Sequence, residues 1–203
     1  MDTSTKKQTV GILIFDDVEV LDFAGPFEVF ATTQLPGHDS VDDKENPFHV
    51  VTIAEKEGTV RCRGGLLVQP NHTINDHPPL DILVVPGGYG TRRQAENPIV
   101  LDWIAAQDAT TQLTTSVCTG AFLLAARGLL DNLPATTHWG SIDRLKSTHP
   151  LIDVRDDVRY VDNGHILTSA GVSAGIDMSL HIVGRIHGEA VAKQTARRME
   201  YTG

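Results

Sequence analysis

A cysteine in the middle of the chain stands where a buried-strand pattern changes to a helical one. Cys118 lies in "TTSVCTGAFLLAARG", residues 114–128, directly before Thr119 and Gly120. A nucleophile on such a turn faces the substrate, and the free N–H groups at the helix start point at the reacting atom. A helix start also stabilises a thiolate, so we expect a lowered pKa for Cys118. Cysteine is often a small buried hydrophobe instead, but the position and Gly120 favour a nucleophile.

A glycine-rich segment upstream supplies candidate hydrogen-bond donors for charge that develops on a substrate. "PGGYG" closes the apolar run "DILVV" and presents the backbone N–H groups of Gly87, Gly88 and Tyr89. Thr119 adds an N–H group directly after the cysteine. Two such donors form an oxyanion-type pocket. Taken alone, the glycines are equally consistent with a plain tight turn, and the nearby cysteine motif favours the functional interpretation.

The acid or base that a cysteine mechanism needs is less clearly marked, because no histidine directly follows Cys118. The acidic residues near the start of the chain that are candidates for this role are Asp16, Asp17, Glu19 and Asp22. Asp22 stands in the apolar context "VLDFAGP", where burial would raise its pKa and suit it to act as a general acid. A side chain that caps the first helical turn is an equally well supported interpretation at this point.

His138, in "ATTHW", is a second candidate base and, with Tyr89, a possible pocket residue. A histidine beside a tryptophan is more often a hydrogen-bonded structural residue, and we favour that role. Cys62 lies between two arginines and is interpreted as an incidental free thiol, since a cytosolic setting disfavours disulfides. The other histidines are scattered without ligand spacing, so the sequence predicts no metal site.

Apolar runs and helical periodicities alternate along the chain. Continuous apolar runs predict strands that are buried on both faces. These strands are expected at 10–15, 48–55, 81–85 and 112–118, with shorter strands within 59–70 and a hairpin over 158–171. Helices are expected over 20–30, 97–109, 119–130, 137–149 and 173–201, and loops over 36–47 and 71–79. Pro26 should break or restart the first helix.

This alternation predicts an α/β sandwich with a mostly parallel central sheet. A chain of 203 residues fits one domain, which we place at residues 10–203 behind a flexible polar lead-in, residues 1–9. Ligands of such sheets bind at the carboxyl ends of the strands. We therefore expect both "PGGYG" and "SVCTG" at that edge of the sheet.

Charge and hydropathy narrow the class of partner. The formal net charge is −9 at pH 7, which argues against a surface that binds nucleic acid. No apolar run reaches the roughly 18 residues of a membrane span, and the first apolar segment is too short for a secretory signal. We expect a cytoplasmic protein with a small-molecule substrate and with no nucleic-acid or membrane partner.

Longer segments carry a family resemblance. "LDFAGPFEVF", "DILVVPGGYG", "TTSVCTGAFLLAARGLLDNLPATTHW" and "TSAGVSAGIDMSLHIVG" together resemble the ThiJ/PfpI superfamily, which has the class I glutamine-amidotransferase-like fold. Within it, the combination of "SVCTG" and "LDxxGP" resembles the isonitrile hydratase branch. The resemblance implies a flavodoxin-like three-layer sandwich, usually a homodimer. It also implies a nucleophile at Cys118, a matching Thr119, an acidic partner at Asp22 and a donor at Gly87–Gly88.

The resemblance implies hydration of an isonitrile to an N-substituted formamide, without a cofactor, through a cysteine thioimidate. Two other functions stay open. The segments "AFLLA" and "ATTHW" are at least as typical of the amidotransferase-like domain of AraC-type transcription regulators, so a ligand- or redox-sensing module is the main alternative. A hydrolase or deglycase of small aldehydes is less favoured, because such relatives often carry histidine where this chain has Thr119.

Overall fold

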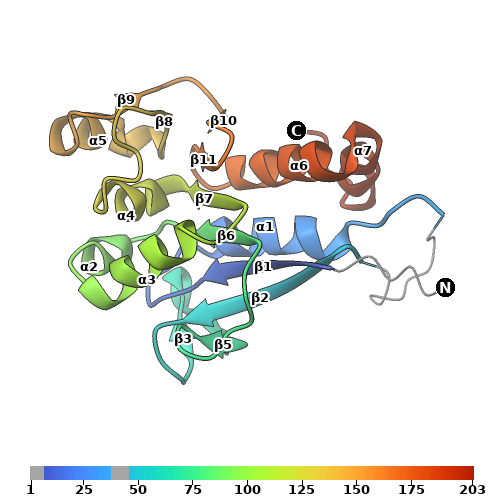
Figure 1. Ribbon diagram of the computed structural model, residues 1–203, viewed down its shortest axis with the longest axis horizontal. Helices are drawn as coiled ribbons and strands as arrows, with labels where there is room; N and C mark the ends of the chain where they lie inside the picture. Colours follow the sequence, from blue (N-terminus) through green and yellow to red (C-terminus); the bar gives the residue numbers. More distant parts are fainter. Residues whose placement is uncertain (1–6, 38–45) are drawn as a thin grey trace.

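The computed structural model describes residues 7–37 and 46–203 (Figure 1). Residues 1–6 of the expected lead-in, and residues 38–45 of the expected loop over 36–47, lie outside this part of the chain. The first strand begins at Gln8 rather than at Val10. The end of the expected lead-in is therefore part of the sheet.

A seven-stranded sheet forms the centre of the described structure, in the order β10-β11-β7-β6-β1-β2-β5. Its strands are β1 (Gln8–Leu13), β2 (Phe48–Ala54), β5 (His72–Thr73), β6 (Ile82–Val85), β7 (Leu113–Val117), β10 (Tyr160–Asp162) and β11 (Ile166–Ser169). All neighbouring pairs are parallel except β10 and β11, which form the expected hairpin. The mostly parallel sheet is thus confirmed. The segment expected as a loop over 71–79 instead contributes the short edge strand β5.

Two short ribbons complete the β-structure of the described residues. The strands β3 (Val60–Arg61) and β4 (Leu67–Val68) pair antiparallel, and β8 (Pro134–Ala135) and β9 (Asp153–Val154) pair parallel. Every residue of β6 and β7 is buried, because helices cover both faces of the central sheet.

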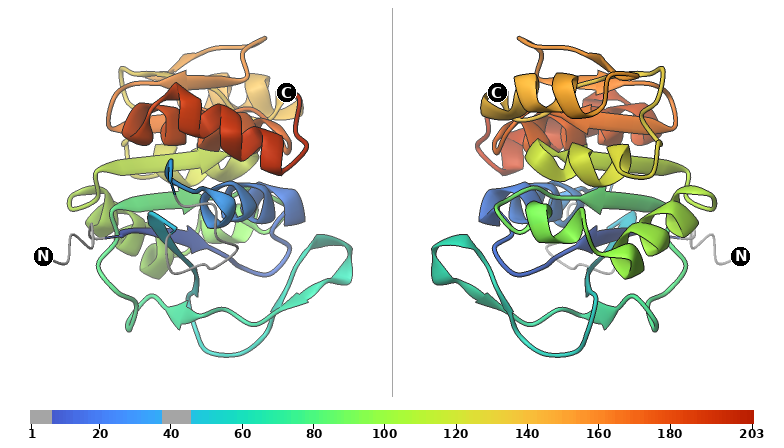
Figure 2. Two further views of the ribbon diagram at one scale, coloured as in Figure 1. Left: turned by 90° about the vertical axis from the view of Figure 1, so that its right-hand side faces the viewer. Right: turned by 90° about the vertical axis from the view of Figure 1, so that its left-hand side faces the viewer.

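Helices form a layer on each side of the sheet, as the two views of Figure 2 show. One layer contains α1 (Val20–Thr32), α6 (Ala174–His187) and α7 (Glu189–Arg198), and the other contains α2 (Thr91–Gln94), α3 (Pro98–Asp108) and α4 (Ala121–Ala125). The helix α5 (Ile142–Thr148) lies beside β9, at the end of the molecule. The three-layer sandwich is confirmed. No helix of the described residues is long and apolar enough to cross a membrane.

Two helix predictions were wrong in detail. α1 continues through Pro26, whose buried ring packs close to Gly175 of α6, and this tertiary packing offsets the cost of proline inside a helix. The helix expected over 119–130 contains only the short α4, which follows a 3₁₀ turn at Cys118–Gly120. The chain leaves the helix soon afterwards, and Gly128 there has a φ of 69°.

Candidate active site

The loops that follow four neighbouring strands meet at one edge of the sheet. They come after β1, β6, β7 and β11, which are adjacent in the sheet order. The chain proceeds from β1 outward to β2 on one side, and β6 lies on the other side of β1. This reversal is the kind of switch point where open α/β sheets bind ligands. Asp22 follows β1, the glycine segment follows β6, and Cys118 follows β7.

The turn at Cys118 is a strained one that its neighbours hold in place. Cys118 has a φ of 56°, a value that residues other than glycine rarely adopt. Its N–H group donates to the carbonyl of Ala170 at 3.2 Å, and its own carbonyl accepts from Oγ1 of Thr137 at 2.7 Å. A Cβ on Gly120 would lie 2.0 Å from the carbonyl oxygen of Val85. Only glycine therefore allows the chain to turn so closely beneath the cysteine.

Asp22 is completely buried and points into this edge of the sheet from α1. Its Oδ2 accepts the backbone N–H of Gly87 at 3.0 Å, and the Cys118 thiol and the N–H of Val172 also interact with its carboxyl group. Oδ1 has no well-formed hydrogen bond within the described residues. The side chain does not cap α1, which begins after Glu19. Of the two interpretations of Asp22, the geometry therefore supports an acid beside Cys118 rather than a helix cap.

The pKa values of Asp22 and Cys118 are both raised. Burial raises the pKa of Asp22 to about 7, against the lowering effect of the hydrogen bonds from Gly87 and Cys118. Burial and then the charge of Asp22 raise the pKa of Cys118 to about 12. The expected lowering of the thiol pKa is therefore wrong, because desolvation outweighs the influence of a short helix start. At neutral pH Cys118 is therefore a protonated thiol, and the carboxyl group of Asp22 beside it titrates near neutral pH.

Both glycine N–H groups of the segment "PGGYG" have acceptors within the protein. The N–H of Gly87 is used by Asp22, and the N–H of Gly88 donates to Oγ1 of Thr119 at 3.1 Å. Neither N–H group is thus free to act as an oxyanion donor. A Cβ on Gly87 would lie 2.6 Å from the nitrogen of Thr119 and 2.7 Å from Oδ2 of Asp22. The glycines let the loop approach the acid and the nucleophile closely.

Thr119 ties this loop to the nucleophile turn. Its hydroxyl lies 3.3 Å from the carbonyl oxygen of Gly88 and 3.2 Å from Oγ1 of Thr91. Its backbone N–H interacts with the sulfur of Cys118 and lowers the pKa of the thiol, against the larger effect of burial. Thr119 therefore contacts the reacting sulfur through its backbone and orders the loop through its side chain.

His138 forms part of the pocket wall. Its Nδ1 accepts the N–H of Gly140 at 3.1 Å and caps the 3₁₀ turn at Trp139–Ser141. A Cβ on Gly171 would lie 2.2 Å from the ring, so the ring packs directly on that glycine. Since Nδ1 accepts a hydrogen bond, the neutral ring carries its proton on Nε2. This arrangement fits the favoured structural role rather than that of a general base.

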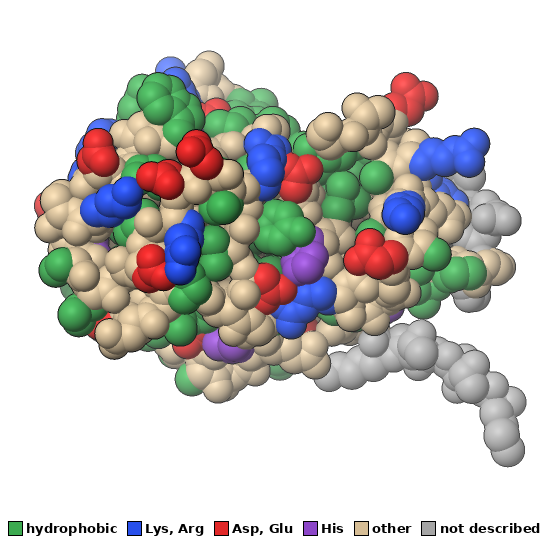
Figure 3. All heavy atoms as spheres, turned by 90° about the horizontal axis from the view of Figure 1, so that it is seen from above, with side chains coloured by type: hydrophobic (Ala, Val, Ile, Leu, Met, Phe, Trp, Pro, Cys, Tyr) green, Lys and Arg blue, Asp and Glu red, His purple; other side chains and the backbone are tan. Residues whose placement is uncertain are grey.

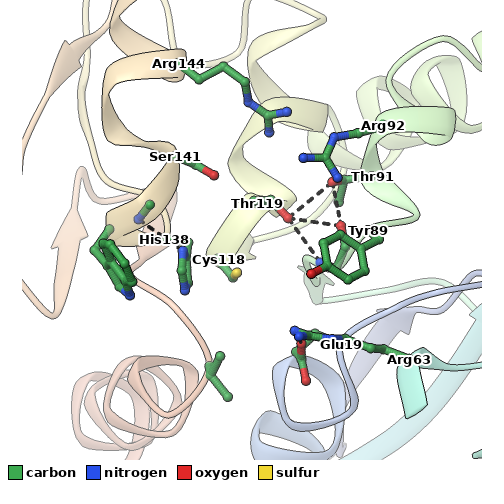
Figure 4. Close-up of a pocket in the computed structure, with 14 residues that line it drawn as sticks. Glu19, Arg63, Tyr89, Thr91, Arg92, Cys118, Thr119, His138, Ser141 and Arg144 are labelled. Atoms are coloured by element: carbon green, nitrogen blue, oxygen red, sulfur yellow. Dashed lines mark hydrogen bonds and ion pairs between the residues drawn. The ribbon is translucent and has the colours of Figure 1, made fainter.

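The sulfur of Cys118 opens into a cavity of about 360 Å³ (Figure 4). Tyr89 lines it, as expected, and its ring lies 4.8 Å from the guanidinium of Arg63. Lining residues that the sequence analysis did not single out include Arg63, Arg92, Ser141, Arg144 and Val172. No local pattern marks these side chains as pocket residues, and only the fold brings them together. Cys62 is buried elsewhere, and the described residues contain no group of three side chains suited to a metal ion.

Comparisons with known proteins agree with this arrangement. The family model described as "DJ-1/PfpI family" matches residues 8–185. The isonitrile hydratase of Pseudomonas putida is 36% identical over 95% of this chain and 78% of its own length. The HTH-type transcriptional regulator GbdR of Pseudomonas aeruginosa is 26% identical over 96% of this chain, which spans only 51% of the regulator. A ThiJ/PfpI family protein from Pseudomonas syringae superposes with a TM-score of 0.84 at 28% identity, covering 97% of this chain and 76% of that one.

Proposed function

The chain belongs to the DJ-1/PfpI family, and on that premise we propose that it is a cysteine-dependent isonitrile hydratase, which adds water to R–N≡C to give an N-substituted formamide. The observation that carries the proposal is the interaction between Cys118, which lines a small cavity, and the carboxyl group of Asp22, which is buried beside it. The 36% identity to the isonitrile hydratase of Pseudomonas putida, over 95% of the chain, supports the same reaction.

The first half of the reaction forms a covalent intermediate. The Asp22 carboxylate accepts the thiol proton of Cys118 as the sulfur attacks the terminal isonitrile carbon. A C–S bond forms, and Asp22 returns the proton to the same carbon, which gives the thioimidate R–N=CH–S. Asp22 is suited to both transfers because its pKa is about 7, near the operating pH. Covalent catalysis divides one difficult addition into two easier steps.

The second half consumes water and frees the cysteine. Asp22 takes a proton from water while the oxygen attacks the thioimidate carbon, the electron pair of the C=N bond moves to nitrogen, and Asp22 passes the proton to that nitrogen. The C–S bond of the tetrahedral adduct then breaks with its electron pair leaving on sulfur, and the remaining hydroxyl proton moves to this thiolate, which restores the Cys118 thiol. One water is consumed, and R–NH–CHO leaves.

The alternative functions have weaker support. A redox sensor needs an accessible thiolate, whereas Cys118 is 6% exposed and its pKa is raised to about 12. In a deglycase of the kind that carries histidine after the nucleophile, a bulkier ring would replace Thr119. Here the Thr119 hydroxyl already holds Gly88 and Thr91. A homodimer and a cytoplasmic location stay predictions.

The test is turnover of neutral isonitriles, such as n-butyl isonitrile, with the formamide followed by NMR. The wild-type protein should form the formamide, and a protein trapped at early times should carry a Cys118 adduct that is heavier by the full mass of the isonitrile. Cys118→Ala should abolish both signals, whereas Cys62→Ala should retain them. Formamide production that survives Cys118→Ala, or no turnover by the wild type over a broad panel of isonitriles, would refute the proposal.

A further inference from the structure

Two arginine side chains converge on the cavity from opposite walls. Arg92 comes from α2 and Arg144 comes from α5. Figure 4 shows their guanidinium groups pointing toward one another, with the hydroxyl of Ser141 directed into the same space and the sulfur of Cys118 facing the same cavity. The two guanidinium groups and the Ser141 hydroxyl are all hydrogen-bond donors, and none of these three takes part in the chemistry proposed above.

Neither of these arginines has a carboxylate partner within the described part of the chain. Arg92 only approaches the ring of Tyr89, at 5.7 Å, and Arg144 lies over the ring of Phe122, at 3.9 Å. The third arginine of the cavity differs from them, because Arg63 forms an ion pair with Glu19. The cavity therefore contains positive charge that the protein itself does not neutralise.

Many cations on the outer surface have a carboxylate partner. On the face seen in Figure 3, Lys and Arg side chains alternate with Asp and Glu. Ion pairs on the described surface include Lys146–Asp156, Arg155–Asp153 and Arg185–Asp162. Arg92 and Arg144 belong to the cations of the described residues without such a partner, and they are the two of these that line the cavity with Cys118.

Part of the Arg144 guanidinium is also shielded from water. Its Nε is buried and has no hydrogen-bond acceptor within the described residues. Burial lowers the pKa of this guanidinium, and the charge of Arg92 lowers it further. Removing a charged donor from water is costly unless an acceptor or a counter-charge replaces the water. A bound anion would supply both.

We infer that the substrate is an isonitrile that carries a carboxylate, and that Arg92, Arg144 and Ser141 bind this carboxylate while the isonitrile carbon faces Cys118. The inference rests on the proposed function. Guanidinium groups match a carboxylate with paired hydrogen bonds. A cavity of about 360 Å³ lies at the lower end of the range for small-molecule sites, which favours a short isonitrile acid. The carboxylate forms and breaks no bond in the reaction.

The experiment compares isocyanoacetate with its methyl ester, which has the same reacting group and no charge. We expect the acid to have a KM about 10- to 100-fold below that of the ester, as charge-assisted hydrogen bonds predict. Rising ionic strength should raise the KM of the acid more than that of the ester. Equal KM values for the two compounds in the wild-type protein would overturn the inference.

Variants separate the charge from the packing. Arg144→Met keeps a long side chain over Phe122, and Arg92→Gln changes a residue on the exposed rim. Each should raise the KM of the acid about tenfold or more, and by a clearly larger factor than it raises the KM of the ester. Lys146→Gln, on the same helix as Arg144 but paired with Asp156 on the surface, should leave both substrates unchanged. Equal effects of the arginine variants on acid and ester would contradict the inference.

Binding of the product distinguishes a failure of this inference from a failure of the proposed function. N-formylglycine, the hydration product of isocyanoacetate, can be titrated calorimetrically into the wild-type protein and into Arg144→Met. Binding to the wild type that is lost in the variant, without turnover of any isonitrile, supports the carboxylate site and refutes the hydratase function. Turnover of neutral isonitriles, with no binding of N-formylglycine and no preference for the acid, refutes the carboxylate site alone.

Discussion

The backbone N–H of Gly87 lies 3.0 Å from Oδ2 of Asp22 and donates a hydrogen bond to it. This contact joins the loop after β6 to the first turn of α1, beside the sulfur of Cys118. It also means that the acid is held by a backbone group, which no side-chain substitution removes directly. The hydrogen bond can form only because residue 87 is a glycine, since a Cβ at this position would lie 2.7 Å from the same oxygen.

Gly87→Ala should therefore disrupt the site by steric overlap, although it removes no catalytic group. The added Cβ would overlap Asp22 and the backbone of Thr119, and overpacking of this kind costs about 1–3 kcal/mol of stability. We expect a lower midpoint of urea unfolding and a large loss of kcat. Gly140→Ala is the matched control for stability, because its Cβ would approach His138 no closer than 3.4 Å. Equal unfolding midpoints for wild type and Gly87→Ala would contradict this prediction.

The ionised form of Asp22 should limit the rate at low pH. Because its pKa is raised to about 7 and the carboxylate accepts the thiol proton, kcat/KM for a neutral isonitrile should fall about tenfold per pH unit below that value. Asp22→Asn keeps an acceptor for Gly87 but no base, and should lower kcat about 10²- to 10⁴-fold. A pH–rate profile of both proteins checks this, and a wild-type rate that is independent of pH from about 5 to 8 would argue against Asp22 as the base.

The same carboxyl group should make the fold less stable as the pH rises. Its pKa is 3.8 in the reference state and about 7 in the folded protein, so the folded state binds the proton more tightly. The stabilisation is complete below the lower value and is lost as the pH rises through the higher one. A shift of about three units corresponds to at most about 4 kcal/mol.

Asp22→Asn removes this dependence and provides its measurement. Relative to wild type, the variant should gain unfolding free energy as the pH rises from about 4 to about 7. Urea unfolding at a series of pH values would show the gain as a shift of the difference between the two midpoints in favour of the variant. A constant gap over this range would show that Asp22 does not titrate there.

The Thr119 hydroxyl should affect stability and activity by fixing the loop after β6, which contains Gly87 and Gly88. Thr119→Val removes the acceptor of the Gly88 N–H, and an unsatisfied, partly buried donor costs about 1–3 kcal/mol. We expect lower stability together with a lower kcat, since the loop also positions Asp22 through Gly87. Thr119→Ser keeps the hydroxyl and should restore both properties to near wild type. If the serine variant is as impaired as the valine variant, the hydroxyl is not the important group.

Residue type and local pattern were enough to predict two parts of the site. A cysteine between a buried strand and a helix, and a glycine-rich end of the preceding strand, placed Cys118 and Gly87 at one edge of a parallel sheet. The apolar context of Asp22 left its role open between a general acid and a helix cap, and only the family resemblance implied the acid. The same patterns predicted the central strands, because continuous apolar runs in a parallel sheet differ clearly from amphipathic helices. Pro26 misled this approach, since the packing of its ring against α6 is a tertiary contact.

The pKa values of the site residues, and which side chains meet at the cavity, were decided only by the tertiary structure. The pKa of Cys118 depends on how completely the thiol is desolvated and on the charge of Asp22, and neither can be derived from the neighbouring sequence. Whether the Gly87 and Gly88 N–H groups are free depends on the acceptors opposite them. Arg92 and Arg144 are ordinary helix residues in sequence and face one cavity only because α2 and α5 flank the same loops. Sequence determines which groups are present, while the fold determines which of them lose water and meet.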